Sequence, residues 1–538
     1  MTETTPEKLH LATKIAYGAG DLGPAITANI SVFYLLFFFT DVAGLPAGLA
    51  GSVLMIGKIA DAINDPIIGM WSDRTNTRWG RRIPWMLCGA LPFGIIYLLQ
   101  WLIPTDNQGL LFVYYVIIGI FFNITYTIVS LPYQALTPEL TLDYNERTSL
   151  NSVRFAFSIG GSILSLILYI LVTNAYPDNA RERFILLALI CSLLSVIAVI
   201  WCALGVRERG VTPILGISQK IRLGTGLAIA GGISGIYGIA RVFLNGLDFT
   251  TISTLLLGIQ VIAFGLTLRY GKPEPHLIDE KATRQRQESI DTPAIPFREQ
   301  LKIVFNNRPF LYVIGIYLCS WLGVQLTASI IVYFVVSYMG LPEKQSGLVA
   351  LAVQGTALVM LFFWQKVSEK LDKKTVYFLG MIFWIIAQIG LFLLQPGQAG
   401  LMYFLAILAG FGVSVAYLIP WSMVPDVIEL DELQTGKRRE GVFYAFMVLL
   451  QKIGLALGLF LVGIALEAAG FKAAVAGEAI PVQPESALTA IRFAIGPLPA
   501  FFLIIGLILA YFYPITRAVH EEILLKLAER KRETGENP

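Results

Sequence analysis

The residues best suited to chemistry lie in one apolar segment, GKIADAINDP, at positions 57–66. Asp61 and Asp65 are four residues apart, so on a helix their carboxyl groups project side by side from one face. Lys58 stands one turn before Asp61 on nearly the same face. Two carboxylates so close in a low-dielectric interior repel each other unless a cation or a shared proton lies with them. The spacing predicts a site for a hard cation such as Na⁺, or for a proton.

Two further residues offer oxygen atoms to the same cation. Asn64 lies beside Asp65 in the segment, and the hydroxyl of Thr127 lies in a later apolar stretch. A purely structural interpretation stays open beside this one. In that interpretation Lys58 clamps the carboxylates, and Asp65 lies near a helix end.

Three more charged residues fall within apolar stretches, namely Asp21, Arg154 and Lys452. Placing such a group in a membrane span costs about 3 kcal/mol on insertion scales, so each one is a functional hypothesis. Arg154 and Lys452 can compensate the carboxylates or hold a polar substrate group. In the alternative interpretation each long side chain extends to the membrane interface (snorkelling). This alternative suits Arg154 better, because Arg154 lies nearer a helix end. Asp21, within YGAGDLG, is interpreted either as a gate or substrate contact or as a helix-end charge.

Aromatic and amide side chains also recur along the apolar stretches. A sugar site typically combines stacking rings with hydrogen-bonding amides, although most membrane aromatics serve packing or the interface. The candidates for substrate contact on these stretches are Tyr126, Ser130, Gln134, Gln325 and Tyr417, and Lys58 is a further candidate.

The amino-acid composition indicates which class of protein carries these residues. Of 538 residues, 56% are hydrophobic and 14% charged, and the mean hydropathy is +0.68. Soluble domains carry about a quarter charged residues, so a soluble enzyme, a secreted disulfide scaffold and a disordered chain are excluded. The net charge of +3 gives no nucleic-acid footprint. We find no metal or nucleophile constellation, and expect neither an enzyme nor a cofactor beyond a coupling ion, Na⁺ or H⁺.

A spanning helix needs about 20 mainly apolar residues, and the chain offers two sets of six such stretches. The first set runs over 15–40, 47–71, 83–103, 109–137, 150–173 and 183–205. The second set runs over 310–339, 346–365, 375–395, 400–424, 441–468 and 489–513.

These spans divide the chain into four parts. We expect an N-terminal six-helix bundle (1–205), a central cytoplasmic linker (206–300), a C-terminal six-helix bundle (301–513) and a cytoplasmic tail (514–538). The linker contains two extra apolar segments, 223–240 and 249–268, which we interpret as a hairpin of two spanning helices. Two re-entrant or interfacial helices are the alternative.

The distribution of basic residues orients the spans. With both termini in the cytoplasm, most of the 40 Lys and Arg fall on the inner side, and only Arg181, Arg183, Arg241, Lys344 and Lys472 fall outside. Such an asymmetry follows the positive-inside rule. We therefore predict a multi-pass protein of the cell (inner) membrane. Its expected partners are the lipid bilayer, a small-molecule substrate and the coupling cation, and we expect a monomer.

The loop between the second and third spans, GMWSDRTNTRWGRR at 69–82, has a counterpart, KVSEKLDKK at 366–374, in the second half. Two six-helix halves with matched loops favour a transporter whose bundles rock about a central site. The first loop resembles the signature of the major facilitator superfamily, which implies an all-α membrane protein of two six-helix bundles, with the hairpin as an addition. We assign a gating role to its signature residues, Gly69, Asp73, Arg74, Gly80, Arg81 and Arg82.

Longer motifs in both halves resemble one family. DAINDP, SDRTNTRWGRRIPW, TYTIVSLPYQALTPELTLDYNERTSLNSVR and DVIELDE…GVFYAFMVLLQKIG are similar to the glycoside–pentoside–hexuronide:cation symporters. The resemblance covers both six-helix halves but not 206–300. It implies a cation site at Asp61, Asp65, Asn64 and Thr127, with Lys58 in place of an arginine. It further implies that Arg154 contacts substrate and that Lys452 faces the site.

The sugar-binding pattern of that family is only partly present. Its two galactoside-binding aspartates fall on Ala25 and Ser130, and its stacking tryptophan falls on Gln134. The related sodium-dependent lysophosphatidylcholine transporters also lack those aspartates. The sequence therefore predicts a symporter of a sugar or glycoside that works by alternating access, with a lysophospholipid or another amphiphile as the alternative substrate.

Overall fold

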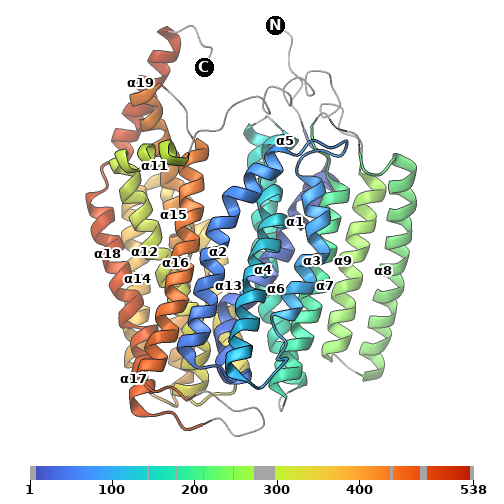
Figure 1. The fold of residues 1–538 in the computed structure, drawn as a ribbon. Coiled ribbons are helices and arrows are strands. Elements are labelled where there is room, and N and C mark those ends of the chain that lie inside the picture. The colour runs from blue at the N-terminus through green and yellow to red at the C-terminus, as the bar shows by residue number, and fades with distance from the viewer. Residues whose placement is uncertain are drawn as a thin grey trace. The chain divides into compact units, whose positions relative to one another are not determined.

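The structure of the chain is a computed structural model, and it describes residues 8–141, 144–176, 179–209, 211, 213–245, 248–271, 297–436, 440–472 and 481–533. The polar linker stretch 272–296 lies outside the described residues. Helices make up nearly all of the described chain (Figure 1). Before the linker they are α1 Leu11–Ile30, η1 Ser31–Leu35, η2 Phe38–Val42, α2 Ala47–Arg74, α3 Ile83–Leu99, α4 Gln108–Gln134, α5 Thr137–Leu140, α6 Tyr144–Ala175, α7 Ala180–Gly205, α8 Ile217–Asn245 and α9 Phe249–Tyr270.

After the linker the helices are α11 Phe297–Asn306, α12 Arg308–Tyr333, η4 Phe334–Tyr338, α13 Lys344–Lys370, α14 Lys373–Leu393, α15 Ala399–Thr435, α16 Glu440–Ala468, α17 Glu485–Ile495, α18 Pro497–Phe512 and α19 Arg517–Glu533. Among the described residues, 11 helices are long and apolar enough to cross a membrane. The charged helix α2, the shorter α3, and α1 with its continuation lie over the three remaining stretches that the sequence predicts to span the membrane.

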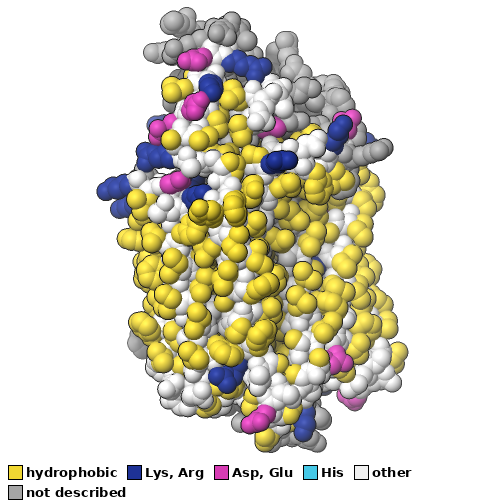
Figure 2. Space-filling view, turned by 90° about the vertical axis from the view of Figure 1, so that its left-hand side faces the viewer, with side chains coloured by type: hydrophobic (Ala, Val, Ile, Leu, Met, Phe, Trp, Pro, Cys, Tyr) yellow, Lys and Arg dark blue, Asp and Glu magenta, His cyan; other side chains and the backbone are white. Residues whose placement is uncertain are grey.

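The surface agrees with a lipid environment. Figure 2 shows a broad hydrophobic band on one face, with charged side chains gathered above and below it. Because lipid cannot hydrogen-bond to exposed backbone groups, continuous helices are the natural way for this chain to cross the band. The chain is thus a multi-pass membrane protein.

The described chain divides into two compact units. The first unit consists of residues 1–38 and 59–293, and the second consists of residues 39–58 and 294–538. The division falls inside helix α2, so Lys58 belongs to the second unit while Asp61 and Asp65 belong to the first.

A repeated local structure in the second unit reveals an internal repeat. The π-helical segments η2 and η4 each run into a glycine with positive φ, 73° at Gly44 and 65° at Gly340. The next backbone N–H donates back across the turn, from Leu45 to Phe39 over 2.9 Å and from Leu341 to Val335 over 3.0 Å. A left-handed glycine at a helix end permits this capping bond. Residues 44–74 and 340–370 therefore correspond without a gap.

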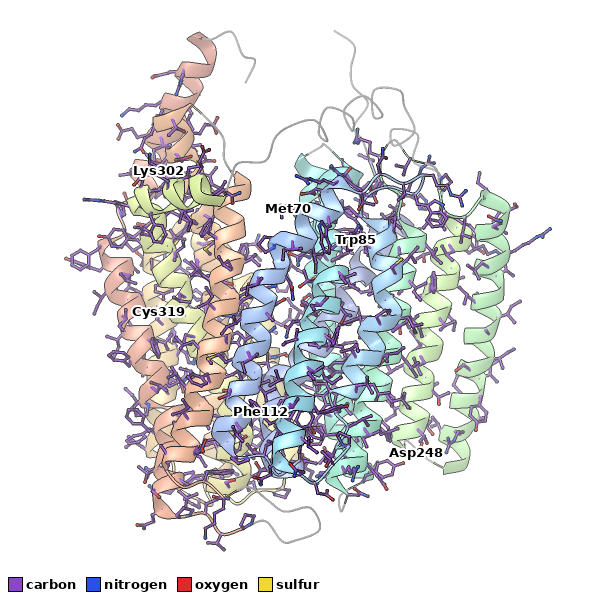
Figure 3. The ribbon with its side chains drawn as sticks, viewed as in Figure 1. Met70, Trp85, Phe112, Asp248, Lys302 and Cys319 are labelled. Carbon is purple, nitrogen blue, oxygen red and sulfur yellow. The ribbon has the colours of Figure 1, made fainter. Side chains whose placement is uncertain are left out.

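The two extra helices form a tightly packed hairpin within the first unit (Figure 1). A Cβ on Gly231 of α8 would lie 2.7 Å from the carbonyl oxygen of Gly258 on α9, so the two backbones meet directly. Asp248 caps α9 by accepting from the Thr251 N–H at 2.8 Å, and Figure 3 shows it at the turn of the hairpin.

Polar contacts attach this hairpin to α7. Trp201 Nε1 donates to Thr267 Oγ1 at 2.7 Å, and the Gln260 amide donates to the Leu194 carbonyl at 2.9 Å. The ring of Trp201 also stacks on Phe264, with centroids 6.0 Å apart. The hairpin is therefore an integral part of the first unit's packing.

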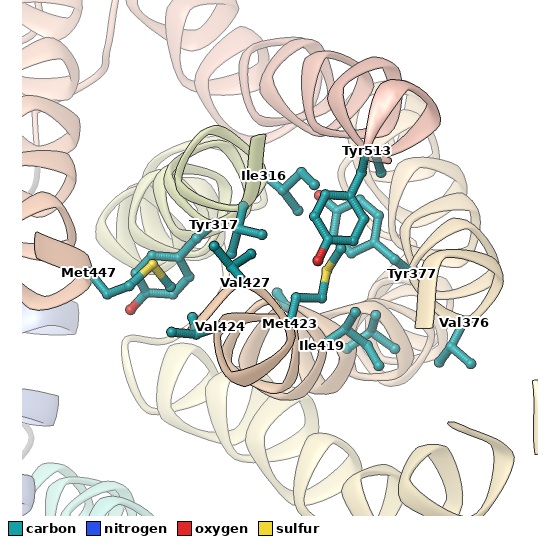
Figure 4. Packing of buried hydrophobic residues seen from close by; sticks show 14 of the residues in the cluster. Ile316, Tyr317, Val376, Tyr377, Ile419, Met423, Val424, Val427, Met447 and Tyr513 are labelled. Carbon is teal, nitrogen blue, oxygen red and sulfur yellow. The ribbon is translucent and has the colours of Figure 1, made fainter. Parts of the chain in front are cut away.

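The core of the second unit forms where α12, α14 and α15 converge. Figure 4 shows Met423 of α15 pointing toward Tyr377 of α14 and Tyr513, while Tyr317 of α12 lies near Val424 and Met447. The Tyr377 hydroxyl lies 2.7 Å from Ser320 Oγ, so the phenol is satisfied within the apolar core. This core fixes the face of α12 that carries the second unit's candidate residues.

Candidate functional site

The two carboxyl groups of α2 meet the hydroxyl of one threonine on α4. Thr127 Oγ1 lies 2.9 Å from Asp61 Oδ1 and 2.9 Å from Asp65 Oδ1. Asp61 is fully buried, Thr127 is 1% exposed and Asp65 is half-buried. The structure thus brings together three of the four residues expected at a cation site, all within the first unit.

This arrangement has an electrostatic consequence. A threonine hydroxyl carries one hydrogen and donates to one acceptor at a time. When it donates to one carboxylate, its oxygen still lies 2.9 Å from an oxygen of the other. Such a contact is favourable if the second carboxyl carries a proton or if a cation is bound by the oxygens. The geometry suits a group of oxygen atoms that shares one positive charge.

Asn64 is the fourth residue of the expected shell. It lies on α2 between the two aspartates and is half-buried. The Asn64 side chain makes no hydrogen bond among the described residues. Asn64 is therefore next to Asp65 in the sequence but is not hydrogen-bonded to either carboxylate.

The internal repeat shows that this chemistry belongs to the first half alone. In the register set by Gly44 and Gly340, the positions that correspond to Asp61 and Asp65 are Ala357 and Leu361. Both replacements lack an oxygen ligand. The corresponding helix α13 therefore cannot form a second acidic pair.

Arg154 pairs with an acid in the same unit. Its Nε lies 3.2 Å from Oδ2 of Asp21, which joins α6 to α1. The guanidinium also lies over the ring of Tyr133, 5.7 Å from its centroid. Tyr133 stacks on Tyr17 at 5.1 Å and donates to the Tyr17 carbonyl at 3.0 Å. A half-buried arginine that is held in this way can present its remaining N–H groups to a polar ligand.

The other candidates of the first unit lie along α4. Tyr126 is half-buried, and its ring lies 6.0 Å from that of Phe93. Ser130 is buried, whereas Gln134 is exposed. Ser130 and Gln134 make no side-chain hydrogen bond among the described residues, so the structure does not connect them to the Arg154–Asp21 pair.

In the second unit, a polar stripe runs along one face of α12. Trp321 and Gln325 are four residues apart, and a buried Trp321 Nε1 and Gln325 Oε1 have no hydrogen-bond partner among the described residues. Gln325 is 3% exposed, while Tyr417 of α15 is 40% exposed and lies 5.5 Å from the Trp321 ring, edge to face. An unmatched acceptor beside an unmatched donor suits a ligand with hydroxyl groups.

Lys452 lies on the neighbouring helix α16, where it is half-buried. Glycines two and six residues later let α12 approach α16 closely. A Cβ on Gly454 would lie 3.8 Å from the Trp321 ring, and one on Gly458 would lie 3.6 Å from Gln325 Cβ. Lys452 is thus placed on the helix that packs against the polar stripe.

The loop after α2 is held by ion pairs at one end of the first unit. Asp73 pairs with Arg82, and Arg81 pairs with Glu139 of α5, with Arg81 Nε donating at 2.8 Å.

Arg74 is exposed in the last turn of α2. Trp85 donates to Thr75 Oγ1 at 2.8 Å, and Figure 3 shows it near Met70, at the end opposite Phe112. Gly69 precedes this network, and the Ser72 hydroxyl donates to its carbonyl at 3.0 Å.

Glu208 is the residue of this network that the sequence did not reveal. Its carboxylate accepts the N–H groups of Arg81, Arg82 and Ile83, each at 2.8 Å, and so caps the start of α3. Burial raises the pKa of the Glu208 carboxyl, and these three bonds oppose the shift. Gly80 has φ +114°, and a Cβ there would overlap the carboxylate. An acid three residues after the sixth span was the available signal.

Comparison with known proteins gives one family. The sequence profile described as MFS/sugar transport protein matches residues 16–229 and 243–517 of the chain. An uncharacterized symporter of Synechocystis sp. is 62% identical over 540 residues, which cover 98% of each protein. The sodium-dependent lysophosphatidylcholine symporter 1 of Xenopus tropicalis is 24% identical over 534 residues, which cover 98% of this chain and 92% of the relative.

A solved structure shows the same architecture. The xylose transporter XylE from E. coli, in its inward open conformation, matches with a TM-score of 0.55 at 14% identity. The match covers 95% of this chain and 98% of that one. At this identity the likeness concerns the fold, and it confirms the expected architecture of two helix bundles.

Proposed function

The chain belongs to the family of MFS/sugar transport proteins, and from this premise we propose that it is a cation-coupled symporter that works by alternating access. It is a membrane transporter and not an enzyme. The observation that carries the coupling proposal is the pair Asp61 and Asp65, joined through Thr127 inside the first unit. Two adjacent acids in a membrane span are costly unless a positive charge joins them.

The coupling ion is Na⁺ or H⁺, and both use the same oxygen atoms. Na⁺ would take its ligands from Asp61, Asp65 and Thr127, and Asn64 on the same helix is the fourth ligand that we propose. A proton would be shared between the two carboxyl groups. Either ion compensates one of the two negative charges and so relieves the repulsion within the pair, and this favours the conformational states that also accept substrate.

We propose a sugar or glycoside as the substrate. The exposed Tyr417 ring beside Trp321 offers a stacking surface, and Gln325 offers a buried acceptor. In the first unit Arg154, already paired with Asp21, offers guanidinium donors to hydroxyl or acidic groups. Tyr126 and Lys452 are the next candidates for contact.

A lysophospholipid is the second candidate substrate. Ser130 and Gln134 stand where the resemblance places an acidic and a stacking residue for galactosides, and Gln134 is exposed. One relative is named a sodium-dependent lysophosphatidylcholine symporter. An arginine with free N–H groups can bind a phosphate as readily as a sugar acid.

The orientation that we propose follows from the basic loops. The loop expected at 366–374 is helical except for residues 371 and 372, because α13 runs to Lys370 and α14 begins at Lys373. The segments 73–84 and 366–374 carry clustered Lys and Arg, and we place them on the cytoplasmic side of the inner membrane together with both termini. The ion pairs of Asp73 with Arg82 and of Arg81 with Glu139 then act as a cytoplasmic gate. We propose a monomer as the transporting unit.

The test is uptake by proteoliposomes that contain the purified protein. A panel of glycosides, pentoses and hexuronates and one lysophosphatidylcholine is offered under an imposed Na⁺ gradient, an imposed proton gradient, or neither. We expect accumulation of one sugar class that requires one of the gradients. Accumulation of the lysolipid alone would select the second substrate, and gradient-independent uptake of every compound would refute coupling.

A further inference from the structure

The open end of the α8–α9 hairpin carries basic residues just outside its two apolar segments. Lys220 and Arg222 precede the segment 223–240, and Arg269 follows the segment 249–268. Lys220 is half-buried, whereas Arg222 and Arg269 are exposed. Basic residues that flank an apolar segment in this way lie at the level of the lipid headgroups when the segment crosses a bilayer. The hairpin therefore presents cations at one membrane interface.

Helix geometry places two of these cations where α8 and α9 meet. A Cβ on Gly224 would lie 2.8 Å from the backbone nitrogen of Arg269 and 3.2 Å from its Cβ, so the two positions are at the same level. Lys220 stands four residues before Gly224 and shares its face of α8. Arg222 is about 200° around the helix from Lys220. Lys220 and Arg269 therefore lie on the facing sides of the two helices, and Arg222 lies on the side away from α9.

The charged group that acts on Lys220 is a second cation, Arg207, in the segment before α8. Arg207 is half-buried, and its Nε donates to the Val211 carbonyl at 2.8 Å. Among the described residues, neither Lys220 nor Arg207 has a carboxylate partner. The acid next to Arg207 is Glu208, whose carboxylate already accepts three backbone N–H groups at the start of α3. Two half-buried cations that repel each other are stabilised by an anion that binds beside them.

Apolar and aromatic side chains accompany these cations. Ile217 and Ile221 lie one turn apart, before and after Lys220, and both are exposed. The guanidinium of Arg269 lies 5.4 Å from the centroid of the Tyr270 ring, which is also exposed. Exposed apolar groups beside unpaired cations suit a ligand that combines an anionic headgroup with acyl chains. A free phosphate ion would use the cations alone.

The closed end of the hairpin differs, because its cation is paired. Arg241 Nη2 lies 3.4 Å from Asp248 Oδ2, and Figure 3 shows Asp248 at the turn. The positive charge at the turn is thus balanced within the hairpin itself. The cations at the open end are left for a ligand from outside the described chain.

We propose that the basic seam of the hairpin, which consists of Arg207, Lys220 and Arg269, binds the phosphate group of an anionic phospholipid. The side chains of Ile217 and Ile221 contact the acyl chains of the same lipid. Basic groups between membrane helices are a recurring type of site for anionic headgroups. The site belongs to the first unit alone, and it does not depend on which substrate or coupling ion the protein carries.

Native mass spectrometry of the full-length protein tests this site, because it counts the bound lipids directly. The protein in detergent is titrated with phosphatidylglycerol and with phosphatidylcholine of the same acyl chains. We expect half-saturation with phosphatidylglycerol at a concentration about fivefold lower or less, because each Lys or Arg near an anionic headgroup contributes about that factor. Equal binding of the two lipids overturns the proposal. Displacement of phosphatidylglycerol by an equal concentration of inorganic phosphate also overturns it, since the site would then bind the ion without a lipid.

Variants locate the bound lipid. Lys220→Gln and the exposed Arg269→Gln should each weaken binding of phosphatidylglycerol about fivefold, whereas Lys220→Arg, which keeps the charge, should bind as the parent does. Arg222→Gln is the matched control, since it removes one charge from the same end of α8 on the side away from α9. Binding that is unchanged in both Lys220→Gln and Arg269→Gln overturns the proposal. An equal loss in Arg222→Gln and Lys220→Gln overturns it as well, because the attraction would then be general to this surface.

Discussion

At the scale of single residues, the spans contain so few charged side chains that each one is informative about function. Only 14% of the chain is charged, so a buried aspartate such as Asp61 is conspicuous. Its partner Asp65 follows from helical spacing, while the position of Thr127 between them is a product of the fold, 62 residues away from Asp65. The Thr127 hydroxyl contacts both carboxyl groups, so the three side chains form one cluster of oxygen atoms.

Replacing Thr127 by Val should weaken binding of the coupling cation while preserving the shape of the side chain. Loss of a group that hydrogen-bonds to metal ligands typically reduces metal affinity about 10- to 100-fold, and the Thr127 hydroxyl contacts both carboxyl groups. The concentration of Na⁺ or H⁺ that gives half-maximal uptake should shift by that factor. Thr125→Val is the control, because the Thr125 hydroxyl donates only to the Phe121 and Phe122 carbonyls of its own helix. Equal effects of the two substitutions would contradict the assignment.

At the scale of elements, the extra hairpin shows how glycine sets helix packing. Gly231 of α8 is next to Gly232, yet their surroundings differ. A Cβ on Gly231 would lie 2.7 Å from Ile262 N and from the Gly258 carbonyl oxygen, while a Cβ on Gly232 would meet nothing within 4 Å. Small residues at such a crossing allow van der Waals contact between backbones, which stabilises helix pairs in membranes.

The Gly231→Ala substitution should therefore separate α8 from α9 and lower the stability of the protein by about 1–3 kcal/mol. Gly232→Ala should be neutral or slightly stabilising, because alanine is the better helix former. Thermal unfolding of both variants in the same detergent provides the measurement. If both variants melt at the same temperature, the packing described for the hairpin is wrong.

The elements and the acidic pair could be predicted from sequence because each leaves a periodic or compositional signal. Spans appear as apolar stretches, and Asp61 and Asp65 share a face through a spacing of four. The π-helical segments η2 and η4 leave no such signal. Glu208 leaves only a weak signal, an acid shortly after the sixth span, because the backbone N–H groups that it accepts lie 125 to 127 residues earlier in the chain. Its role depends on how the loop before α3 folds.

At the scale of the whole molecule, the basic residues are distributed unevenly along the chain. Most of the basic residues lie at or between the ends of the predicted spans, including the segments 73–84 and 366–374. The hydrophobic band in Figure 2, with charged side chains above and below it, agrees with this distribution. The two sets of six spans that we propose, with a hairpin of two spans between them, would place both termini on one side of the membrane.

A reporter fused to the C-terminus checks this topology. A green fluorescent protein after residue 538 should fluoresce, and alkaline phosphatase at the same place should be inactive, because the positive-inside rule puts this end in the cytoplasm. Alkaline phosphatase inserted between Lys344 and the start of the apolar part of α13 should be active. The reverse pattern would show that the orientation is inverted.

The central claim is that Asp61 and Asp65 couple an ion gradient to substrate accumulation. Its most direct test compares the parent protein with the Asp61→Asn, Asp65→Asn double variant in proteoliposomes, using whichever compound the parent accumulates. We expect gradient-driven accumulation to be lost in the double variant. Ion-driven accumulation that persists unchanged without both carboxylates would contradict coupling through this pair.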